Sequence, residues 1–338
     1  MAFLAMNYRP LFFKNNALYL LDQKALPAKL CYRRCDSARD VACAIRDMTV
    51  RGAPLIGQAA AWGWYLDLAR VRDRRGWGDA ARRAARVLGL ARPPARNIKA
   101  RLELLQRRFG NEESTLLDKK RTLKKFLLAQ ETEWENITAA MARHGSGLLR
   151  ARAQVLTHCN TGRLATLGRG TAFAVIDEAH RQGKLKRFFA CETRPYLQGM
   201  RLTMWELGQA GIPSTLITDG MAAYLMSKKN ISAVLVGADR VAANGDTANK
   251  IGTLSLALAA KHYGVSFYVV CPEETIDRSL GSGRDIVVEE RSTEEVVVIA
   301  GRRLAPPGIS VWHPAFDVTP HDLISAVVTE KGVWRFRG

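Results

Sequence analysis

The sequence predicts an α/β protein with two domains: a small, mainly helical one over residues 1–150 and a larger one over residues 151–338 with a mostly parallel sheet. Beyond residue 150, short apolar runs alternate with helical stretches, which is the pattern of repeated βαβ units. Before residue 150, helical patterns dominate. A chain of 338 residues, of which 47% are hydrophobic, is large enough to bury two cores.

The N-terminal domain is expected to start with a small antiparallel strand pair and to continue in helices. Asp36 is predicted to cap the first helix, because Val41, Ala42 and Ile45 then fall on one face. The predicted strands cover residues 18–21 and 31–34. The predicted helices cover residues 36–48, a stretch from about residue 54, the basic segment 70–108, and residues 112–143.

The C-terminal domain is expected to alternate strands with helices. The predicted strands cover residues 153–157, 187–191, 214–217, 232–236, 266–270 and 309–312. The predicted helices cover residues 163–182, 198–210, 220–229 and 248–262. The fragment Gly168-Arg169-Gly170 falls inside the first of these helices, and no G-x-G-x-x-G fingerprint follows a strand. The sequence therefore does not support a dinucleotide cofactor.

Composition argues against a membrane protein and against a secreted one. No apolar run approaches the roughly 20 residues that a bilayer-spanning helix needs, and no apolar segment near the N-terminus precedes a cleavage site. The expected location is the cytoplasm. The six cysteines include no CxxC pair, and no second Cys/His pair accompanies Cys31 and Cys35. Neither a disulfide framework nor a bound metal is expected.

The formal net charge of +19 is concentrated in one region. Residues 70–108 hold 13 Lys/Arg against 3 Asp/Glu, which gives 13 − 3 = +10. Such a segment can bind nucleic acid. A solvated helical face has the same composition, and here Trp77 is the only candidate for stacking on a base and no nucleic-acid motif is present. We favour the solvated face, and nucleic acid is not an expected partner.

Reactive side chains follow four of the predicted strands, at Cys159, Glu192, Asp219 and Asp239. Cys159 comes after one apolar run and Asp239 after another, and ligands of open α/β sheets bind at the carboxyl ends of strands. A thiol there can act as an acid, a base or a nucleophile, although free cysteines are more often structural. A carboxylate there is costly unless it is paired or used, and Arg240 offers a simple pairing. His158 should point away from Cys159, since neighbouring strand residues face opposite sides.

Anion binding is a candidate role for residues between two helical stretches. Arg51 precedes Gly52, Ala53 and Pro54, and a glycine followed by a helix start presents backbone N–H groups to an anion. Arg51 would add a forked donor suited to phosphate. An ordinary turn between helices has the same composition. Arg92, before two prolines, is a weaker candidate of the same kind.

Two further pairs of polar residues complete the candidate site. Gln198 opens a predicted helix and could reach a substrate hydroxyl, whereas Arg194 could either bind an anion or pair with Glu192. Asn249 and Lys250 lie in a short polar stretch that is expected to open a helix, where an ammonium group would suit a phosphate or sugar oxygen.

These residues resemble the methylthioribose-1-phosphate isomerase family, which is related to regulatory subunits of the eukaryotic guanine-nucleotide exchange factor for translation initiation. The resemblance runs from about Leu20 to Gly332. Its matching stretches are residues 48–54, 157–162, 192–195 with 198–199, 237–240, 244–246, 249–253 and 314–320.

The resemblance implies a Rossmann-like C-terminal domain, a homodimer, and conversion of an aldose 1-phosphate to a ketose 1-phosphate without a cofactor. It implies that Cys159 and Asp239 form the catalytic pair, with Asp239 protonated near neutral pH through burial. It also implies a substrate-binding set, which consists of Arg51, Gly52, Ala53, Arg92, Gln198, Asn249 and Lys250.

Several alternatives stay open from the residues. The 5-substituent of the sugar is not specified, so 5-methylthioribose 1-phosphate competes with 5-deoxyribose 1-phosphate and ribose 1,5-bisphosphate. The hydrogen on C2 could move as a proton, through an enediol-like intermediate, or as a hydride. A non-catalytic regulatory subunit is the alternative from another class, although it would not need Cys159 and Asp239.

Overall fold

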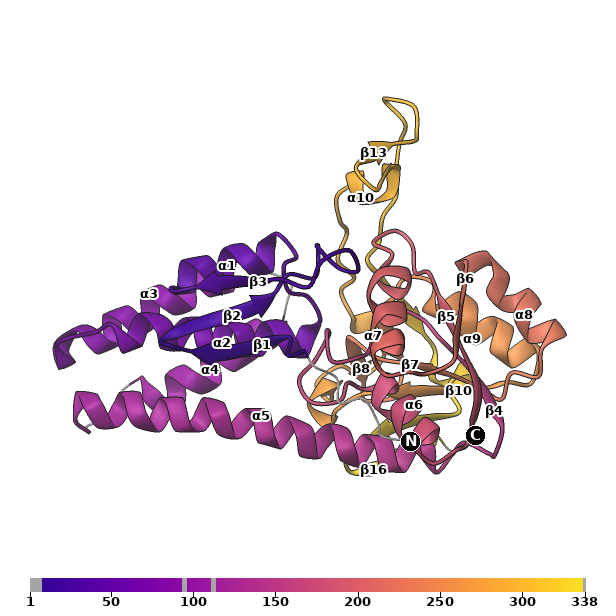
Figure 1. The fold of residues 1–338 in the computed structure, drawn as a ribbon, viewed down its shortest axis with the longest axis horizontal. Helices are drawn as coiled ribbons and strands as arrows, with labels where there is room; N and C mark the ends of the chain where they lie inside the picture. Colours follow the sequence, from indigo (N-terminus) through magenta and orange to yellow (C-terminus); the bar gives the residue numbers. More distant parts are fainter. Residues whose placement is uncertain (1–7, 93–95, 111–113, 337–338) are drawn as a thin grey trace. The chain divides into compact units, whose positions relative to one another are not determined.

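The computed structural model describes residues 8–92, 96–110 and 114–336 (Figure 1). Its contacts divide the chain into two compact units. Of the described residues, the helical unit contains those from Tyr8 to Asn136 together with Arg163–Gly170, and the sheet unit contains Ile137–Gly162 and those from Thr171 onward. The division near residue 150 stays a prediction about independently folding domains.

The helical unit contains a three-stranded antiparallel sheet in the order β1-β2-β3 and the first helices of the chain. Its strands are β1 (Leu11–Lys14), β2 (Ala17–Leu21) and β3 (Tyr32–Cys35). Its helices are α1 (Ala38–Arg46), α2 (Ala53–Ala69), α3 (Trp77–Gly89), α4 (Arg96–Phe109) and the first part of α5 (Leu116–Ser146). The predicted strand pair is present as β2 and β3, and β1 was not predicted.

The cap of α1 differs from the prediction. Ser37, not Asp36, is the N-cap, because its side chain accepts the Asp40 N–H while the Asp40 side chain accepts the Ser37 N–H. This reciprocal capping box satisfies two otherwise unpaired helix donors. Asp36 instead accepts from the Arg34 guanidinium at 2.9 Å.

The sheet unit is built on a seven-stranded sheet in the order β16-β15-β10-β7-β4-β5-β6. All neighbours are parallel except β15 and β16. The strands are β4 (Ala153–Thr157), β5 (Leu185–Cys191), β6 (Ser214–Ile217), β7 (Ala233–Val236), β10 (Ser266–Val270), β15 (Ala326–Thr329) and β16 (Gly332–Trp334). The parallel strands follow the Rossmann order, which confirms the predicted fold class.

Two cores lie on opposite faces of this sheet, because successive strand residues point to opposite sides. On one face Val234 and Phe267 pack with Leu256 of α9 (Thr253–His262). On the other face Leu235 packs with Phe173 of α6 (Ala172–Arg181). Burying a side chain such as Phe173 contributes about 2 kcal/mol. Helices α7 (Met204–Gln209) and α8 (Ala222–Lys228) complete the layers.

A second sheet, in the order β11-β8-β9-β14, corrects two predictions. Its strands are β8 (Arg240–Ala242), β9 (Thr247–Lys250), β11 (Ile276–Asp277) and β14 (Phe316–Thr319). The expected helix over 248–262 begins only at Thr253, because residues 247–250 pair with β14. The expected strand at 309–312 is absent, and the ladder forms at 316–319 instead.

The expected helix over 163–182 is also shorter than predicted. Only Ala172–Arg181 is helical, and residues 163–170 form turns and bends that belong to the helical unit. The Ala165 carbonyl accepts the Leu55 N–H at 3.4 Å, so this segment is held by the start of α2. The periodic pattern could not reveal that contact across more than a hundred residues.

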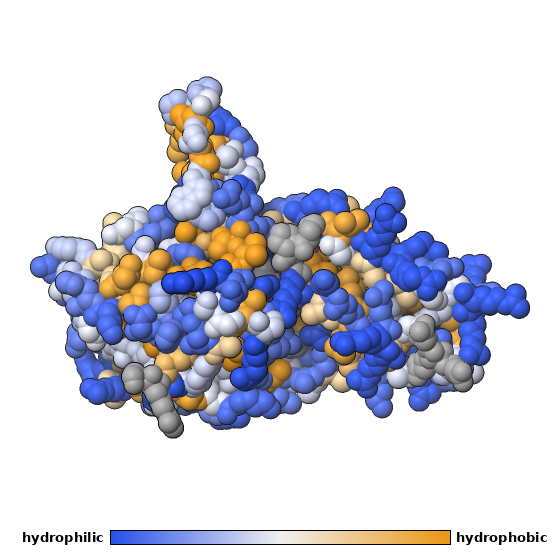
Figure 2. All heavy atoms as spheres, turned by 180° about the vertical axis from the view of Figure 1, so that it is seen from behind, coloured by the Kyte–Doolittle hydropathy of each residue, from blue (hydrophilic) through white to orange (hydrophobic). Residues whose placement is uncertain are grey.

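An arm of the sheet unit (residues 292–313) contains α10 (Glu294–Val297), β12 (Val298–Ile299) and β13 (Arg302–Arg303). Figure 2 shows apolar side chains on this arm. Leu304, Ile309 and Trp312 are among its exposed apolar residues. Across the described residues, no helix combines the length and the apolar character that a membrane crossing requires.

Candidate functional site

The topological switch point of the main sheet lies between β4 and β7. From β4 the chain proceeds outward through β5 to β6, and from β7 it proceeds the other way through β10 to β15. A crevice forms where such a sheet reverses its strand order, outside the carboxyl ends of the two central strands. Cys159 follows β4 and Asp239 follows β7, so both candidate residues flank this point.

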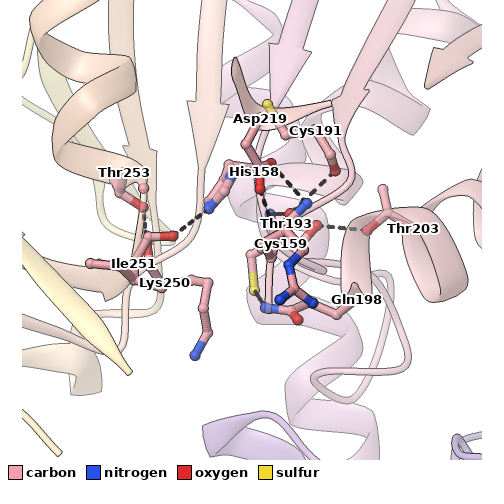
Figure 3. Close-up of polar contacts among 12 residues, drawn as sticks. His158, Cys159, Cys191, Thr193, Gln198, Thr203, Asp219, Lys250, Ile251 and Thr253 are labelled. Carbon is pink, nitrogen blue, oxygen red and sulfur yellow. Dashed lines mark hydrogen bonds and ion pairs between the residues drawn. The ribbon is translucent and has the colours of Figure 1, made fainter. Parts of the chain in front are cut away.

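Cys159 is held from three sides (Figure 3). Its backbone N–H donates to Thr193 Oγ1 at 2.8 Å, and its carbonyl accepts from Thr203 Oγ1 at 2.7 Å. The Gln198 amide Nε2 donates to Cys159 Sγ at 3.3 Å. Cys159 is partly exposed, whereas Gln198 is buried and its Oε1 has no partner among the described residues. The structure therefore brings Cys159 and Gln198 into direct contact.

His158 points away from Cys159, as the strand alternation predicts (Figure 3). Its Nε2 lies 2.8 Å from the Ile251 carbonyl, and its Nδ1 lies 3.8 Å from Asp219 Oδ1. Burial lowers the pKa of His158, and the opposing attraction of Asp219 does not compensate. A neutral imidazole with its proton on Nε2 can then donate to Ile251. His158 is a buried structural group on this geometry, and no Cys–His dyad forms with Cys159.

Among the residues that the structure describes, His158, Cys191 and Asp219 form a group that could hold a metal, since their ligand atoms lie within 4.8 Å of one another. Their present contacts do not fit a metal set well. Asp219 accepts the N–H groups of Thr193 and Arg194 at 2.8 and 2.7 Å. Burial raises the pKa of the Cys191 thiol, so the thiolate that a metal needs is disfavoured. Both Asp219 contacts instead fix the segment that bears Thr193.

Arg194 has a structural environment that neither sequence interpretation anticipated. Its guanidinium donates to the carbonyl of Pro195 at 2.9 Å and to the carbonyl of Val296 at 2.6 Å. These contacts tie the loop after β5 to the arm. The guanidinium therefore holds backbone carbonyls, in place of the expected anion or the Glu192 carboxylate.

Asp239 is joined to the second sheet rather than to a helix. It is half-buried, and its backbone N–H donates to the Ala248 carbonyl at 2.9 Å. Ala248 lies in β9, immediately before Asn249 and Lys250. Asp239 thus lies next to the strand that carries the two predicted binding residues, Asn249 and Lys250, and these residues form a strand where a helix start was expected.

Lys250 and Asn249 are buried on β9, which is unusual for an ammonium group unless it is paired. Lys250 Nζ donates to the Ala315 carbonyl at 2.8 Å and lies 4.5 Å from the centre of the Phe316 ring. Asn249 Nδ2 donates to Thr253 Oγ1 at 3.0 Å. The ladder therefore carries a desolvated positive charge, which attracts an anion more strongly than an exposed one does.

Asp317 is a polar residue of this ladder to which the sequence analysis gave no role. It pairs with Asn249 across β14 and β9, and it accepts the Gly252 N–H at 2.7 Å. Burial raises the pKa of Asp317 to about 6, against the opposing effects of backbone N–H groups and Lys250. Alternation in Phe316-Asp317-Val318-Thr319 was the signal that could have revealed this strand.

In the helical unit, Arg51, Gly52 and Ala53 lie at the start of α2. Gly52 has φ = 93°, and a Cβ there would lie 2.2 Å from the Ala165 carbonyl oxygen, so only glycine fits. Arg51 is buried, and Pro54 occupies the first turn of the helix. The positive end of the helix dipole therefore coincides with a buried arginine, which is the arrangement of an anion site.

Arg92 is half-buried in a bend beyond the end of α3, also in the helical unit. The next three residues, 93–95, lie outside the described residues. The candidate residues thus divide between the units: Arg51, Gly52, Ala53 and Arg92 belong to the helical unit, and Cys159, Gln198, Asp239, Asn249 and Lys250 belong to the sheet unit.

Comparison with known proteins identifies relatives of the whole chain. The model of the Initiation factor 2 subunit family matches residues 49–336. A protein of Thermoanaerobacter sp. (strain X514) named methylthioribose-1-phosphate isomerase is 48% identical to this chain, and the match covers 95% of this chain and 94% of that protein. A protein of the same name from Thermus thermophilus is 47% identical, and the match covers 95% of this chain and 92% of that protein.

Solved structures agree with these relatives. The crystal structure of 5-methylthioribose 1-phosphate isomerase from Pyrococcus horikoshii OT3 has a TM-score of 0.91 and 38% identity, covering 98% of this chain and 96% of that one. A structure titled translation initiation factor eIF-2B, subunit delta, from A. fulgidus has a TM-score of 0.87 and 38% identity, covering 97% and 96%. The chain therefore belongs to the Initiation factor 2 subunit family, within its group of methylthioribose-1-phosphate isomerases.

Proposed function

We propose that this protein isomerises 5-methylthioribose 1-phosphate to 5-methylthioribulose 1-phosphate, a step of methionine salvage. The observation that carries the proposal is 48% identity over 95% of the chain to proteins named for this activity. The contact between Cys159 and Gln198 beside the switch point supports it, because it puts a thiol and an amide where ligands of such sheets bind.

In this proposal Asp239 is the acid and base of the reaction. C1 of the substrate carries a phosphate ester, so the furanose ring opens when Asp239 protonates the ring oxygen and the bond from C1 to that oxygen breaks. A hydrogen then moves from C2 to C1, and the C2 hydroxyl returns a proton to Asp239 as it becomes the ketone. Atoms and charge balance, and no external oxidant or reductant is used.

Cys159 acts beside C1 and C2 in this scheme. It carries the hydrogen as a proton through an enediol-like intermediate, or it stabilises a direct hydride shift. Substrate with deuterium at C2 separates the two routes. Full retention of the label at C1 of the product indicates a hydride shift, whereas exchange with solvent indicates proton transfer through the thiol.

The remaining candidates bind and orient the sugar phosphate. We assign the phosphate to Arg51, Arg92 and Lys250 together with the backbone of Gly52 and Ala53, because arginine forks and helix N-termini suit phosphate oxygens. Gln198 and Asn249 are assigned to sugar hydroxyls. Binding energy from the phosphate then fixes the geometry of the distant reacting carbons.

The decisive experiment is turnover of the purified protein on 5-methylthioribose 1-phosphate, with 5-deoxyribose 1-phosphate and ribose 1,5-bisphosphate in parallel. Efficient conversion of the first sugar, lost in Cys159→Ser, supports the proposed activity. Preference for another sugar keeps the mechanism and changes the pathway. The matched control is Cys43→Ser, in the helical unit.

A non-catalytic regulatory subunit is the second candidate. The relative titled translation initiation factor, 38% identical over nearly the whole chain, favours it specifically. A protein that converts none of the three sugars, although it is folded and binds the phosphate, would support this second function and contradict the first.

We also propose a cytoplasmic homodimer, following the family resemblance. Exposed Leu304, Ile309 and Trp312 on the arm support association, because apolar surface of this kind is commonly buried between subunits. Light scattering coupled to size exclusion should give twice the chain mass of 37.4 kDa. A monomer at micromolar concentration would contradict the dimer without affecting the proposed chemistry.

A further inference from the structure

One residue after β4 and one after β5 adopt backbone conformations that L residues rarely occupy. Cys159 has φ = 69° and Thr193 has φ = 63°, both in the left-handed region. This region is unfavourable for any side chain with a Cβ and most of all for a β-branched residue such as threonine. The surrounding contacts must therefore hold both residues in place.

Threonine hydroxyls bind both polar backbone groups of Cys159 (Figure 3). Thr193 Oγ1 accepts the Cys159 N–H at 2.8 Å and donates to the Cys191 carbonyl at 3.2 Å. Thr203 Oγ1 donates to the Cys159 carbonyl at 2.7 Å. Thr193 and Thr203 are 0% and 1% exposed, so water does not replace either bond.

Two carboxylates extend this network, one through Thr193 and the other through Asn160. Asp219 Oδ1 accepts the Thr193 N–H at 2.8 Å, which holds the strained residue in its left-handed conformation. On the other side, Asn160 Nδ2 contacts Thr203 Oγ1 at 3.3 Å and the buried Glu206 Oε2 at 2.6 Å. The peptide that bears the thiol is thus clamped through one residue after β5 and one at the start of α7.

We propose that Thr193 and Thr203 are positioning residues that aim the Cys159 thiol at the substrate by holding the N–H and carbonyl groups of its backbone. This inference rests on the proposed function of Cys159. Neither hydroxyl touches the reacting atoms in this scheme. Each acts through Cys159, because hydrogen transfer between C1 and C2 needs the thiol at a defined distance and angle.

The test compares valine and serine at each threonine. Valine keeps the shape and removes the hydroxyl, so Thr203→Val and Thr193→Val should each lower kcat about 30-fold while KM stays within about threefold. Thr203→Ser and Thr193→Ser keep the hydroxyl and should restore most of kcat. Thr247→Val is the matched control, because Thr247 is equally buried and its hydroxyl also donates to a backbone carbonyl, that of Gly245.

Unchanged kcat in the valine variants overturns the proposal. A loss that serine does not restore, or that Thr247→Val reproduces, also overturns it, because such a loss reflects general packing. If a valine variant does not fold, Asp219→Asn takes its place, since it weakens the acceptor of the Thr193 N–H and should lower kcat in the same way.

A second readout needs no substrate and separates this inference from the proposed function. Alkylation of Cys159 by iodoacetamide, followed by mass spectrometry, should be about threefold faster or more in the valine variants than in wild type and the serine variants, because the released thiol moves away from Gln198. Cys43 serves as the internal reference. Faster alkylation in a protein that converts none of the sugars refutes the function but keeps the positioning role, whereas an unchanged rate overturns that role.

Discussion

The carboxyl end of β4 and the ladder of β9 with β14 deliver functional groups in opposite ways. At the end of β4 the backbone is strained, and Cys159 is partly exposed among uncharged threonine hydroxyls and an amide. On the ladder the backbone is regular and extended, and Lys250 carries its charge into a buried position. The first region fixes the orientation of the Cys159 side chain, and the second provides the positive charge of Lys250.

This difference indicates a division of labour. A group that transfers hydrogen must be aimed, which local strain and hydrogen bonds achieve. A group that binds phosphate needs mainly charge and desolvation, which a strand ladder achieves without strain. We therefore expect substitutions at the end of β4 to change kcat, and substitutions on the ladder to change KM or the pH dependence of stability.

The largest effect is expected at the proposed catalytic pair. Cys159→Ser and Asp239→Asn should each lower kcat by about 10³-fold, since each removes a group that moves or stabilises the transferred hydrogen. Affinity for a phosphate-bearing inhibitor, measured by calorimetry, should change little. Substantial kcat in either variant would remove that residue from the mechanism.

A backbone clash should produce the next largest effect. A Cβ on Gly199 would lie 1.9 Å from the Cys191 carbonyl oxygen, so Gly199→Ala should lower the free energy of unfolding by about 3 kcal/mol. Gly208 in α7 has open space around its Cα, and Gly208→Ala should stabilise the helix slightly. Urea titration of the two variants measures both free energies of unfolding. Equal values would show that the backbone after β5 shifts to accommodate the added methyl group without a large cost.

The ladder is tested by removing its charge. Lys250→Met should raise KM about 30-fold with little change in kcat, which corresponds to about 2 kcal/mol for a charged hydrogen bond to phosphate. Lys261→Met, on the exposed end of α9, is the control and should leave both constants unchanged. A fall in kcat at constant KM would show that Lys250 acts in the chemical step, as proposed for Cys159, and would contradict the separation of the two roles.

The smallest effect concerns the pH dependence of stability. Burial raises the pKa of Asp317 from its ordinary 3.8 to about 6. Between these values the folded protein keeps a proton that the unfolded chain has lost, so the contribution of Asp317 to stability falls as the pH rises from about 4 to 6. Discounted for partial exposure, the change is about 1 kcal/mol.

Asp317→Asn cannot ionise and should remove this pH dependence. The difference in Tm between Asp317→Asn and wild type should therefore shift in favour of the variant, by about 2 to 4 °C, between pH 4 and pH 7.5. Calorimetry at the two pH values provides the measurement. A constant difference between the two proteins would show that Asp317 titrates near its ordinary pKa.

The sequence by itself determined the βαβ part of the molecule. The predicted strands 153–157, 214–217 and 266–270 coincide with β4, β6 and β10, because strands buried on both faces of a parallel sheet read as continuous apolar runs. The last residue of each apolar run also marks the carboxyl end of its strand. The positions of Cys159 and Asp239 beyond the carboxyl ends of two strands were therefore predictable too.

Only the tertiary structure decided what local patterns cannot encode. Residues 247–250 form a strand because β14 lies beside them, although their polar sequence resembled a helix start. Residues 163–170 join the helical unit through the start of α2. The left-handed backbone of Cys159 depends on hydroxyls 34 and 44 residues away. In each case the deciding free energy comes from hydrogen bonds between segments distant in sequence, which outweigh local propensity.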